Sequence, residues 1–212
     1  MTTFPLLIAV EGIDGVGKST QIPRLCEWLR ERGIEAIQTA EPTREQYGRE
    51  IRTATTRLPP ARERQLFVLD RHEHLQTCIL PALQKGQTVI TDRYFYSSIA
   101  YQGSRRDAFD HDPSPQELET YQAEIAKENR SFAPEADILL FLRLSPDMAI
   151  ERMMSGRESL DPFEARQTLI DVANAFERIV ATHPRAHIID AAKSPDDVTR
   201  EIQQKLEFLF LS

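Results

Sequence analysis

Residues 12–19 read Gly-Ile-Asp-Gly-Val-Gly-Lys-Ser, and this stretch decides the fold. An apolar run at 6–10 precedes it, and the spacing of apolar residues after it is that of a helix. Glycines let the backbone take positive φ and turn its N–H groups inward as a nest for an anion, to which the helix N-terminus adds its dipole. Lys18 is then expected to reach the β and γ phosphates of a nucleoside triphosphate, and the Ser19 hydroxyl to ligate Mg²⁺. The stretch therefore predicts a nucleotide-binding loop rather than an incidental glycine-rich turn.

Five short β-branched or apolar runs alternate with longer helical patterns along the chain. They lie at 6–10, 35–39, 88–91, 138–142 and 187–189. Most of the runs are continuously apolar, which is typical of strands buried on both faces of a parallel sheet. The alternation predicts an open α/β fold with crossover helices.

The segments between these runs have the apolar spacing of helices or the composition of loops. Helical periodicity over 66–84 predicts one helix, which Pro81 should kink because proline has no amide donor. The polar stretch 103–115 predicts a surface loop, followed by a helix that begins near Gln116. Because the chain has no internal repeat or linker, we expect residues 1–212 to form a single domain.

The composition excludes several classes of protein. The chain has 26 Lys and Arg residues against 33 Asp and Glu, a net charge of −7, which disfavours binding to a nucleic-acid polymer. Its longest apolar runs fall far short of the ~20 residues needed to cross a bilayer, and no basic signal sequence precedes them, so we expect neither membrane insertion nor export. Cys26 and Cys78 lack metal-binding spacing, which indicates buried reduced thiols and a cytosolic protein.

A second motif follows the third predicted strand, where residues 92–103 read DRYFYSSIAYQG. It places a carboxylate and a guanidinium at the carboxyl edge of the sheet, beside the nucleotide-binding loop. Arg93 can bridge two phosphates, and Asp92 can hold that arginine or the hydration shell of Mg²⁺. The alternative is a structural ion pair at a strand end. A P-loop switch or assembly ATPase would have a threonine switch and a DxxG run here, so the motif favours a kinase.

Residues 11–20, the dipeptide Glu41-Pro42 and residues 92–103 together resemble the thymidylate kinase family, and the resemblance spans the whole chain. It implies a P-loop nucleoside monophosphate kinase fold with a five-stranded parallel sheet in the order 2-3-1-4-5. It also implies transfer of the γ-phosphoryl group of Mg·ATP to dTMP, giving dTDP and ADP for dTTP supply, by a cytoplasmic homodimer. The alternatives are a kinase for another nucleotide or a nucleoside, or a non-catalytic P-loop switch.

The resemblance assigns roles to individual positions. Those implied to bind ATP are Gly12, Ile13, Asp14, Gly15, Val16, Gly17, Lys18, Ser19, Thr20 and Arg152. Those implied to bind dTMP are Asp14, Glu41, Pro42, Arg44, Phe67, Arg71, Arg93, Ser97, Tyr101 and Gln102. The implied Mg²⁺ positions are Ser19 and Asp92.

The chemistry of these residue types suits the implied roles. Asp14 can accept a hydrogen bond from the deoxyribose 3′-OH, and Arg44 can hold the monophosphate, although a solvated surface arginine is equally typical. Phe67 and Arg71 are four residues apart on a predicted helix, so they can stack on a base and donate to thymine O4. A lone phenylalanine on a helix is more often a core residue. The Gln102 amide can bond both N3–H and a carbonyl of the base.

The predicted lid loop, about 152–164, departs from the family pattern. Gly15 occupies the position where some members carry an arginine, so this chain resembles the subgroup whose catalytic arginine comes from the lid. The lid is poor in arginine, and Arg157 is the residue expected to act with Lys18 and Arg93. Arg105 or Arg106 could substitute for it, and a solvated loop arginine is the alternative.

Overall fold

The computed structural model describes residues 5–154 and 162–210. The elements in chain order are β1 (Leu7–Glu11), α1 (Lys18–Glu31), β2 (Ala36–Ala40), α2 (Gln46–Thr53), α3 (Pro60–His74), a π-helical turn (Leu75–Ile79), α4 (Leu80–Gln84), β3 (Thr88–Asp92), α5 (Phe95–Tyr101), 3₁₀ turns (Gln102–Ser104 and Arg106–Ala108), α6 (Pro115–Arg130), β4 (Ile138–Arg143), α7 (Pro146–Met154), α8 (Pro162–Thr182), β5 (Ala186–Asp190), α9 (Pro195–Leu206) and a 3₁₀ turn (Glu207–Phe210).

Five parallel strands form one sheet in the order β2-β3-β1-β4-β5, which confirms the expected fold class. Each predicted strand differs from the observed one by no more than one residue at either end. β1 lies at the centre, with Ile8 paired to Ile90 of β3 on one side and to Ile138 of β4 on the other. The carboxyl ends of β1 and β3 are therefore neighbours, and the loops that follow them meet.

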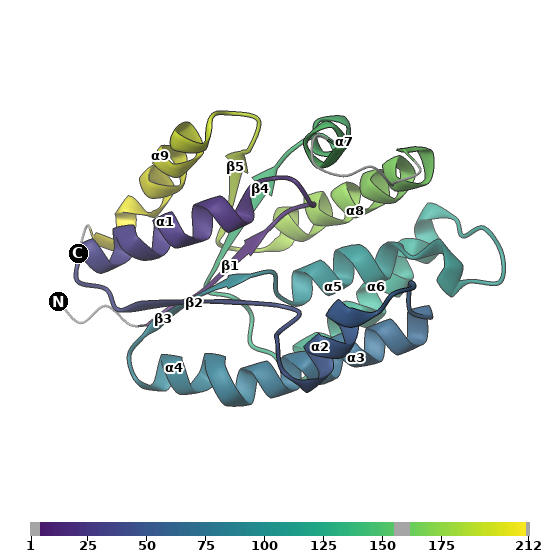
Figure 1. Cartoon of the computed structure of the whole chain (residues 1–212), viewed down its shortest axis with the longest axis horizontal. Helices are drawn as coiled ribbons and strands as arrows, with labels where there is room; N and C mark the ends of the chain where they lie inside the picture. Colours follow the sequence, from purple (N-terminus) through teal and green to yellow (C-terminus); the bar gives the residue numbers. More distant parts are fainter. Residues whose placement is uncertain (1–4, 155–161, 211–212) are drawn as a thin grey trace.

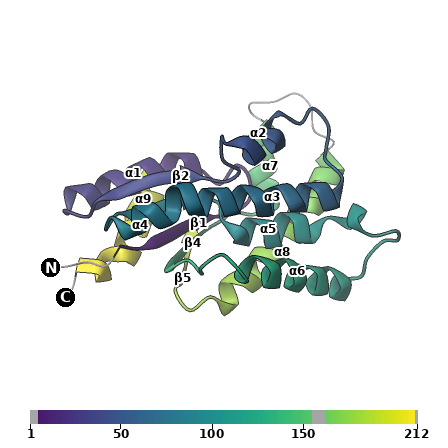
Figure 2. The same ribbon diagram turned by 90° about the horizontal axis from the view of Figure 1, so that it is seen from below.

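Helices cover both faces of the sheet (Figures 1 and 2). Parallel crossovers are right-handed, so the step from β1 to β2 runs over one face and the later steps, in the opposite direction along the sheet, run over the other. Accordingly α1 and α9 pack together on one face, while α5 packs against α6 and α8 on the other.

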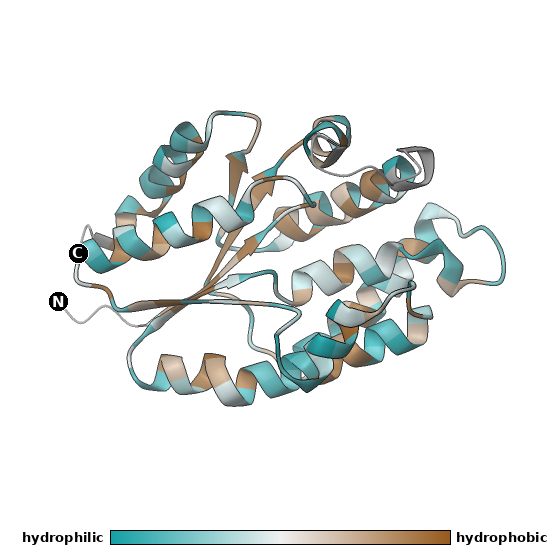
Figure 3. Ribbon diagram, in the orientation of Figure 1, coloured by the Kyte–Doolittle hydropathy of each residue, from teal (hydrophilic) through white to brown (hydrophobic). Residues whose placement is uncertain are grey.

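The core follows the three central strands. Every residue of β1 is buried, as are Ile138–Leu142 of β4. The edge strands β2 and β5 are only partly buried, because each has a neighbour on one side alone. The burial on both faces that is expected for most of the runs is thus confirmed for the three central strands. Figure 3 shows the same pattern, with hydrophobic strands enclosed by helices that are largely hydrophilic outside.

The helix predicted over 66–84 is longer and less regular than expected. It begins at Pro60 and passes through the π-helical turn Leu75–Ile79, where the Leu80 amide donates to the Leu75 carbonyl five residues back. The disruption expected from Pro81 therefore takes the form of a wider turn just before it.

The polar stretch 103–115 is not simply a surface loop. It contains the two 3₁₀ turns, and Arg105 is only 3% exposed because its guanidinium pairs with Glu63 of α3 at 2.6 Å. The helix after it begins at Pro115, capped by Ser114.

Among the described residues, none of the helices has the length and apolar character needed to span a membrane. Cys26 and Cys78 are both free thiols, the first buried and the second half-buried.

Candidate active site

The loop between β1 and α1 has the backbone of an anion-binding nest. Gly12, Gly15 and Gly17 have φ of 145°, 83° and 94°, a region that glycine alone adopts at little cost. The Lys18 ammonium folds back over the loop and donates to the carbonyls of Gly12 at 3.1 Å and Ile13 at 3.3 Å. Burial, and then repulsion from Arg93, lowers the pKa of Lys18 to about 8. A poorly hydrated ammonium held in a nest of amides is suited to receive phosphate oxygens.

Two of these glycines are also required by close packing. A Cβ on Gly12 would lie 2.6 Å from the carbonyl oxygen of Leu142 at the end of β4. A Cβ on Gly15 would lie 3.1 Å from the Ala149 carbonyl of α7 and 3.4 Å from Met153 Cγ. Because α7 packs on position 15, a side chain there would require its neighbours on α7 to move by a few tenths of an ångström.

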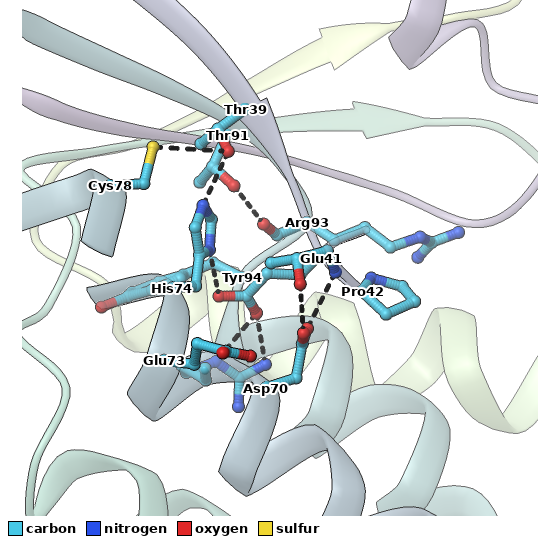
Figure 4. Close-up of polar contacts among 12 residues, drawn as sticks. Thr39, Glu41, Pro42, Asp70, Glu73, His74, Cys78, Thr91, Arg93 and Tyr94 are labelled. Atoms are coloured by element: carbon cyan, nitrogen blue, oxygen red, sulfur yellow. Dashed lines mark hydrogen bonds and ion pairs between the residues drawn. The ribbon is translucent and has the colours of Figure 1, made fainter. Parts of the chain in front are cut away.

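Arg93 stands at the turn between β3 and α5 and reaches the nucleotide-binding loop. Its backbone is left-handed, with φ of 69°, and its carbonyl accepts from the Thr91 hydroxyl at 2.7 Å (Figure 4). Its guanidinium donates to Asp14 Oδ1 at 2.6 Å and to Ser97 Oγ at 3.0 Å, and lies over the Tyr101 ring. The structure thus brings four predicted site residues from three segments into contact.

A cavity of about 280 Å³ opens beside Arg93. Seven predicted dTMP-binding residues line it, namely Asp14, Pro42, Phe67, Arg93, Ser97, Tyr101 and Gln102. The Gln102 carboxamide oxygen is buried and has no hydrogen-bond partner among the described residues. An orphaned buried acceptor is costly unless a ligand donates to it. The cavity therefore offers an aromatic ring, a polar group and an arginine within one lining.

Three residues of this cavity wall were missed by sequence reasoning, namely Arg57, Glu63 and Thr168. Arg105, which the sequence offers only as a substitute catalytic arginine, lines the cavity as well. Arg105 donates to Glu63 at 2.6 Å, to Asp107 at 2.5 Å and to the Leu58 carbonyl at 2.9 Å. The contacts with Glu63 and Leu58 join distant segments, so no local pattern in the sequence could indicate them.

Glu41 and Arg71 are not among the residues that line this cavity. Both side chains are 1% exposed, and Glu41 Oε2 accepts from Arg71 Nη2 at 2.6 Å and Nε at 2.9 Å. Burial alone would raise the pKa of Glu41, but Arg71 and then His74 hold it below its ordinary value. Arg71 also donates to Ser98 and Asn129. Phe67 faces the cavity from the same helix, and direct contact of Glu41 or Arg71 with a nucleotide stays a prediction.

A second, larger cavity of about 910 Å³ lies on the other side of Pro42, which lines both. It brings together the two predicted metal residues, Ser19 and Asp92, with Arg44. Asp92 Oδ1 is buried without a hydrogen-bond partner in the described part of the chain. The described residues hold no cluster of three or more His, Cys, Asp or Glu side chains that could bind a metal by themselves. This arrangement suits a cation that brings most of its own oxygen ligands.

The predicted lid contributes one described arginine. Arg152 of α7 donates to the Ala191 carbonyl after β5 at 2.9 Å and to the Gly15 carbonyl at 3.5 Å. Arg157 lies outside the described residues. Its proposed substitutes are engaged in ion pairs: Arg105 as described above, and Arg106 with Asp171 at 2.9 Å and Asp112 at 2.7 Å.

The sheet order, the nest at the start of α1 and the arginine at the end of β3 define a P-loop phosphotransferase of the nucleoside monophosphate kinase class. Comparisons with known proteins give the particular family. The family model for thymidylate kinase matches residues 10–202. This chain belongs to the thymidylate kinase family.

Individual relatives align with nearly the full length of this chain. A thymidylate kinase from Xanthomonas euvesicatoria pv. vesicatoria is 37% identical, over 92% of this chain and 80% of its own. A thymidylate kinase from Akkermansia muciniphila is 36% identical, over 96% of this chain and 92% of its own. A probable thymidylate kinase from Archaeoglobus fulgidus is 34% identical, over 95% of each chain.

Proposed function

We propose that this chain transfers the γ-phosphoryl group of Mg·ATP to dTMP, giving dTDP and ADP, as members of its family do. The observation that carries the proposal is the cavity lined by Phe67, Gln102 and Arg93, whose guanidinium donates to Asp14 of the phosphate-binding loop. A nucleoside monophosphate placed there would present its phosphate to the loop that holds the donor.

In this proposal the acceptor is held at three points. Phe67 stacks on the thymine, and the orphaned Gln102 oxygen accepts from its N3–H. Asp14 accepts from the 3′-OH. Arg93 holds the monophosphate, for which a guanidinium fork is well shaped, and Arg44, which lines the neighbouring cavity, is proposed to reach the same phosphate.

Catalysis then depends on positioning and on charge. The acceptor phosphate is already anionic, so the reaction needs no general base and no covalent intermediate. Lys18, Arg93 and a lid arginine, for which Arg157 is the candidate, neutralise charge on the transferring group as it develops. Arg152 is proposed to cover the adenine.

The metal belongs to the donor in this scheme. Ser19 and Asp92 would hold Mg²⁺, and the unpartnered Asp92 Oδ1 fits a ligand to the ion or to its hydration shell. When bound, Mg²⁺ would neutralise phosphate charge and fix the geometry of the triphosphate.

A single domain over 1–212, a homodimeric state and a cytoplasmic location are further proposals, supported by the family resemblance. Light scattering coupled to gel filtration measures the oligomeric state, and a monomer at all concentrations would contradict the second of them.

One experiment tests the activity and its rivals. ADP release is measured with a panel of nucleosides and nucleoside monophosphates under Mg·ATP, with EDTA as a control. Turnover with dTMP that EDTA abolishes supports the proposal. Equal turnover with another monophosphate or a nucleoside would favour a different kinase, and acceptor-independent hydrolysis would favour a P-loop switch.

A further inference from the structure

Glu11 is a buried carboxylate to which the mechanism above gives no role. It ends β1 directly before Gly12 and is 0% exposed. Its Oε1 accepts from the amides of Tyr94 at 2.8 Å and Ser97 at 3.2 Å, while its Oε2 accepts from the Ser97 hydroxyl at 2.6 Å. Glu11 therefore joins the start of the nucleotide-binding loop to the first turn of α5.

The Ser97 hydroxyl extends this connection to Arg93. A hydroxyl has one proton, which Ser97 gives to Glu11, so the oxygen is left to accept from Arg93 Nη1 at 3.0 Å. While Glu11 is ionised, it can only accept from Ser97, and because a guanidinium can only donate, Ser97 accepts from Arg93.

The backbone of Arg93 depends on the same carboxylate. Arg93 has a left-handed φ of 69°, a conformation that is strained for a residue other than glycine. The next amide, Tyr94 N–H, is held by Glu11. Glu11 thus holds both the turn that contains Arg93 and the hydroxyl that orients its guanidinium.

The positive charges near Glu11 also favour the ionised form that this network requires. Lys18 and Arg93 both act on Glu11 and favour its ionised form, against burial, which raises its pKa to about 7. Two cations that converge on phosphate would otherwise repel each other without compensation.

We infer that Glu11 is a positioning residue that aligns Arg93 for phosphate binding through Ser97. The inference rests on the proposed function and deepens it, because it names what orients the arginine that the proposal uses.

Glu11→Gln changes this network with little change in shape. The amide oxygen must stay toward the two backbone N–H groups, so the new NH₂ group faces Ser97 Oγ. Ser97 then meets two donors and has no acceptor for its own proton. The contact with Arg93 is lost or weakened, although the volume of the side chain is kept. Ser97→Ala removes the hydroxyl that links Glu11 to Arg93.

The experiment compares wild type, Glu11→Gln, Ser97→Ala and the double variant at pH 8, with dTMP and Mg·ATP. We expect each single variant to lower kcat/KM for dTMP by ~10 to 100-fold, the scale of a disturbed charge-assisted contact, with KM for ATP within ~3-fold of wild type. The double variant should be no worse than the more severe single variant, because both act through one path.

Glu135→Gln is the matched control. Glu135 also holds α5, accepting from the Tyr96 hydroxyl at 2.6 Å, but it has no contact with Arg93. We expect this variant to keep the wild-type kcat/KM for dTMP.

The outcomes separate the two proposals. Absence of dTMP phosphorylation in wild type contradicts the proposed function itself. If wild type is active, wild-type kinetics in Glu11→Gln, multiplicative losses in the double variant, or an equal loss in Glu135→Gln would overturn the role of Glu11. Should Glu11→Gln fail to fold, Ser97→Ala still decides, because an unchanged kcat/KM there excludes the path to Arg93.

Discussion

The nucleotide-binding loop and the acceptor cavity are neighbours, but they are built in different ways. The loop consists of eight consecutive residues, 12–19, whose shape depends on their own glycines and on the helix that follows. The cavity takes Pro42 from the loop after β2, Phe67 from α3, Gln102 from the turn after α5 and Thr168 from α8. A local site of this kind can be found by motif, whereas an assembled site depends on packing. The nucleotide-binding loop and the acceptor cavity should therefore respond differently to substitutions and to changes of substrate.

Base selectivity should show the largest effect, because it depends on the assembled cavity. The buried Gln102 oxygen would meet the N3–H of thymine but a lone pair of cytosine. We expect kcat/KM for dTMP to exceed that for dCMP by ~1,000-fold or more, and that for dUMP, which lacks only a methyl group, by ~10 to 100-fold. Competition kinetics with the three monophosphates measure both ratios. Similar turnover of dCMP and dTMP would show that Gln102 does not read the base.

Lys18→Ala tests the nucleotide-binding loop. Loss of one charge contact to the transferring group should lower kcat by at least ~100-fold while the fold persists. Circular dichroism and a thermal melt serve as the control for folding. Near-normal turnover by a folded variant would remove the phosphoryl-transfer mechanism.

Arg157→Ala tests whether the catalytic charge comes from the lid. An arginine that acts only on the transition state should lower kcat by ~100-fold with little change in KM for dTMP. Arg105→Ala and Arg106→Ala are the matched comparisons, since both guanidinium groups are held in ion pairs and should have small effects on kcat. The opposite ranking would move the catalytic arginine to the loop after Gln102.

The smallest expected effect is a pH dependence of stability at the point where the two regions join. The pKa of Glu11 is raised from 4.5 to about 7, so the folded state holds its proton more tightly than the unfolded chain does. The free energy of unfolding should therefore fall as the pH rises from 5 to 7, by on the order of 2 kcal/mol, and then level off. Urea titrations of wild type and Glu11→Gln isolate this contribution as the difference between them. Parallel curves for the two proteins would show that burial does not raise this pKa.

Much of the fold could be predicted because its signals are local. The central strands appear as continuous apolar runs, since both of their faces are covered, and their ends were located to within one residue. Expectations failed where a partner distant in sequence decides the outcome. Arg105 lies in a polar stretch that predicts a surface loop, yet its side chain is buried because its guanidinium pairs with the Glu63 carboxylate of α3.

The candidate site, like the fold, has a part that local sequence signals predict and a part that depends on residues distant in sequence. Sequence motifs alone determined the nucleotide-binding loop, the Asp92-Arg93 turn and the family, because glycine conformation and side-chain chemistry at fixed spacing do not depend on distant partners. Only the tertiary structure decided that Phe67 faces the cavity while Arg71, four residues later, is buried against Glu41. It alone placed Glu11 against Tyr94 and Ser97, since a buried carboxylate is stabilised by donors whose positions depend on the packing of α5 against the sheet.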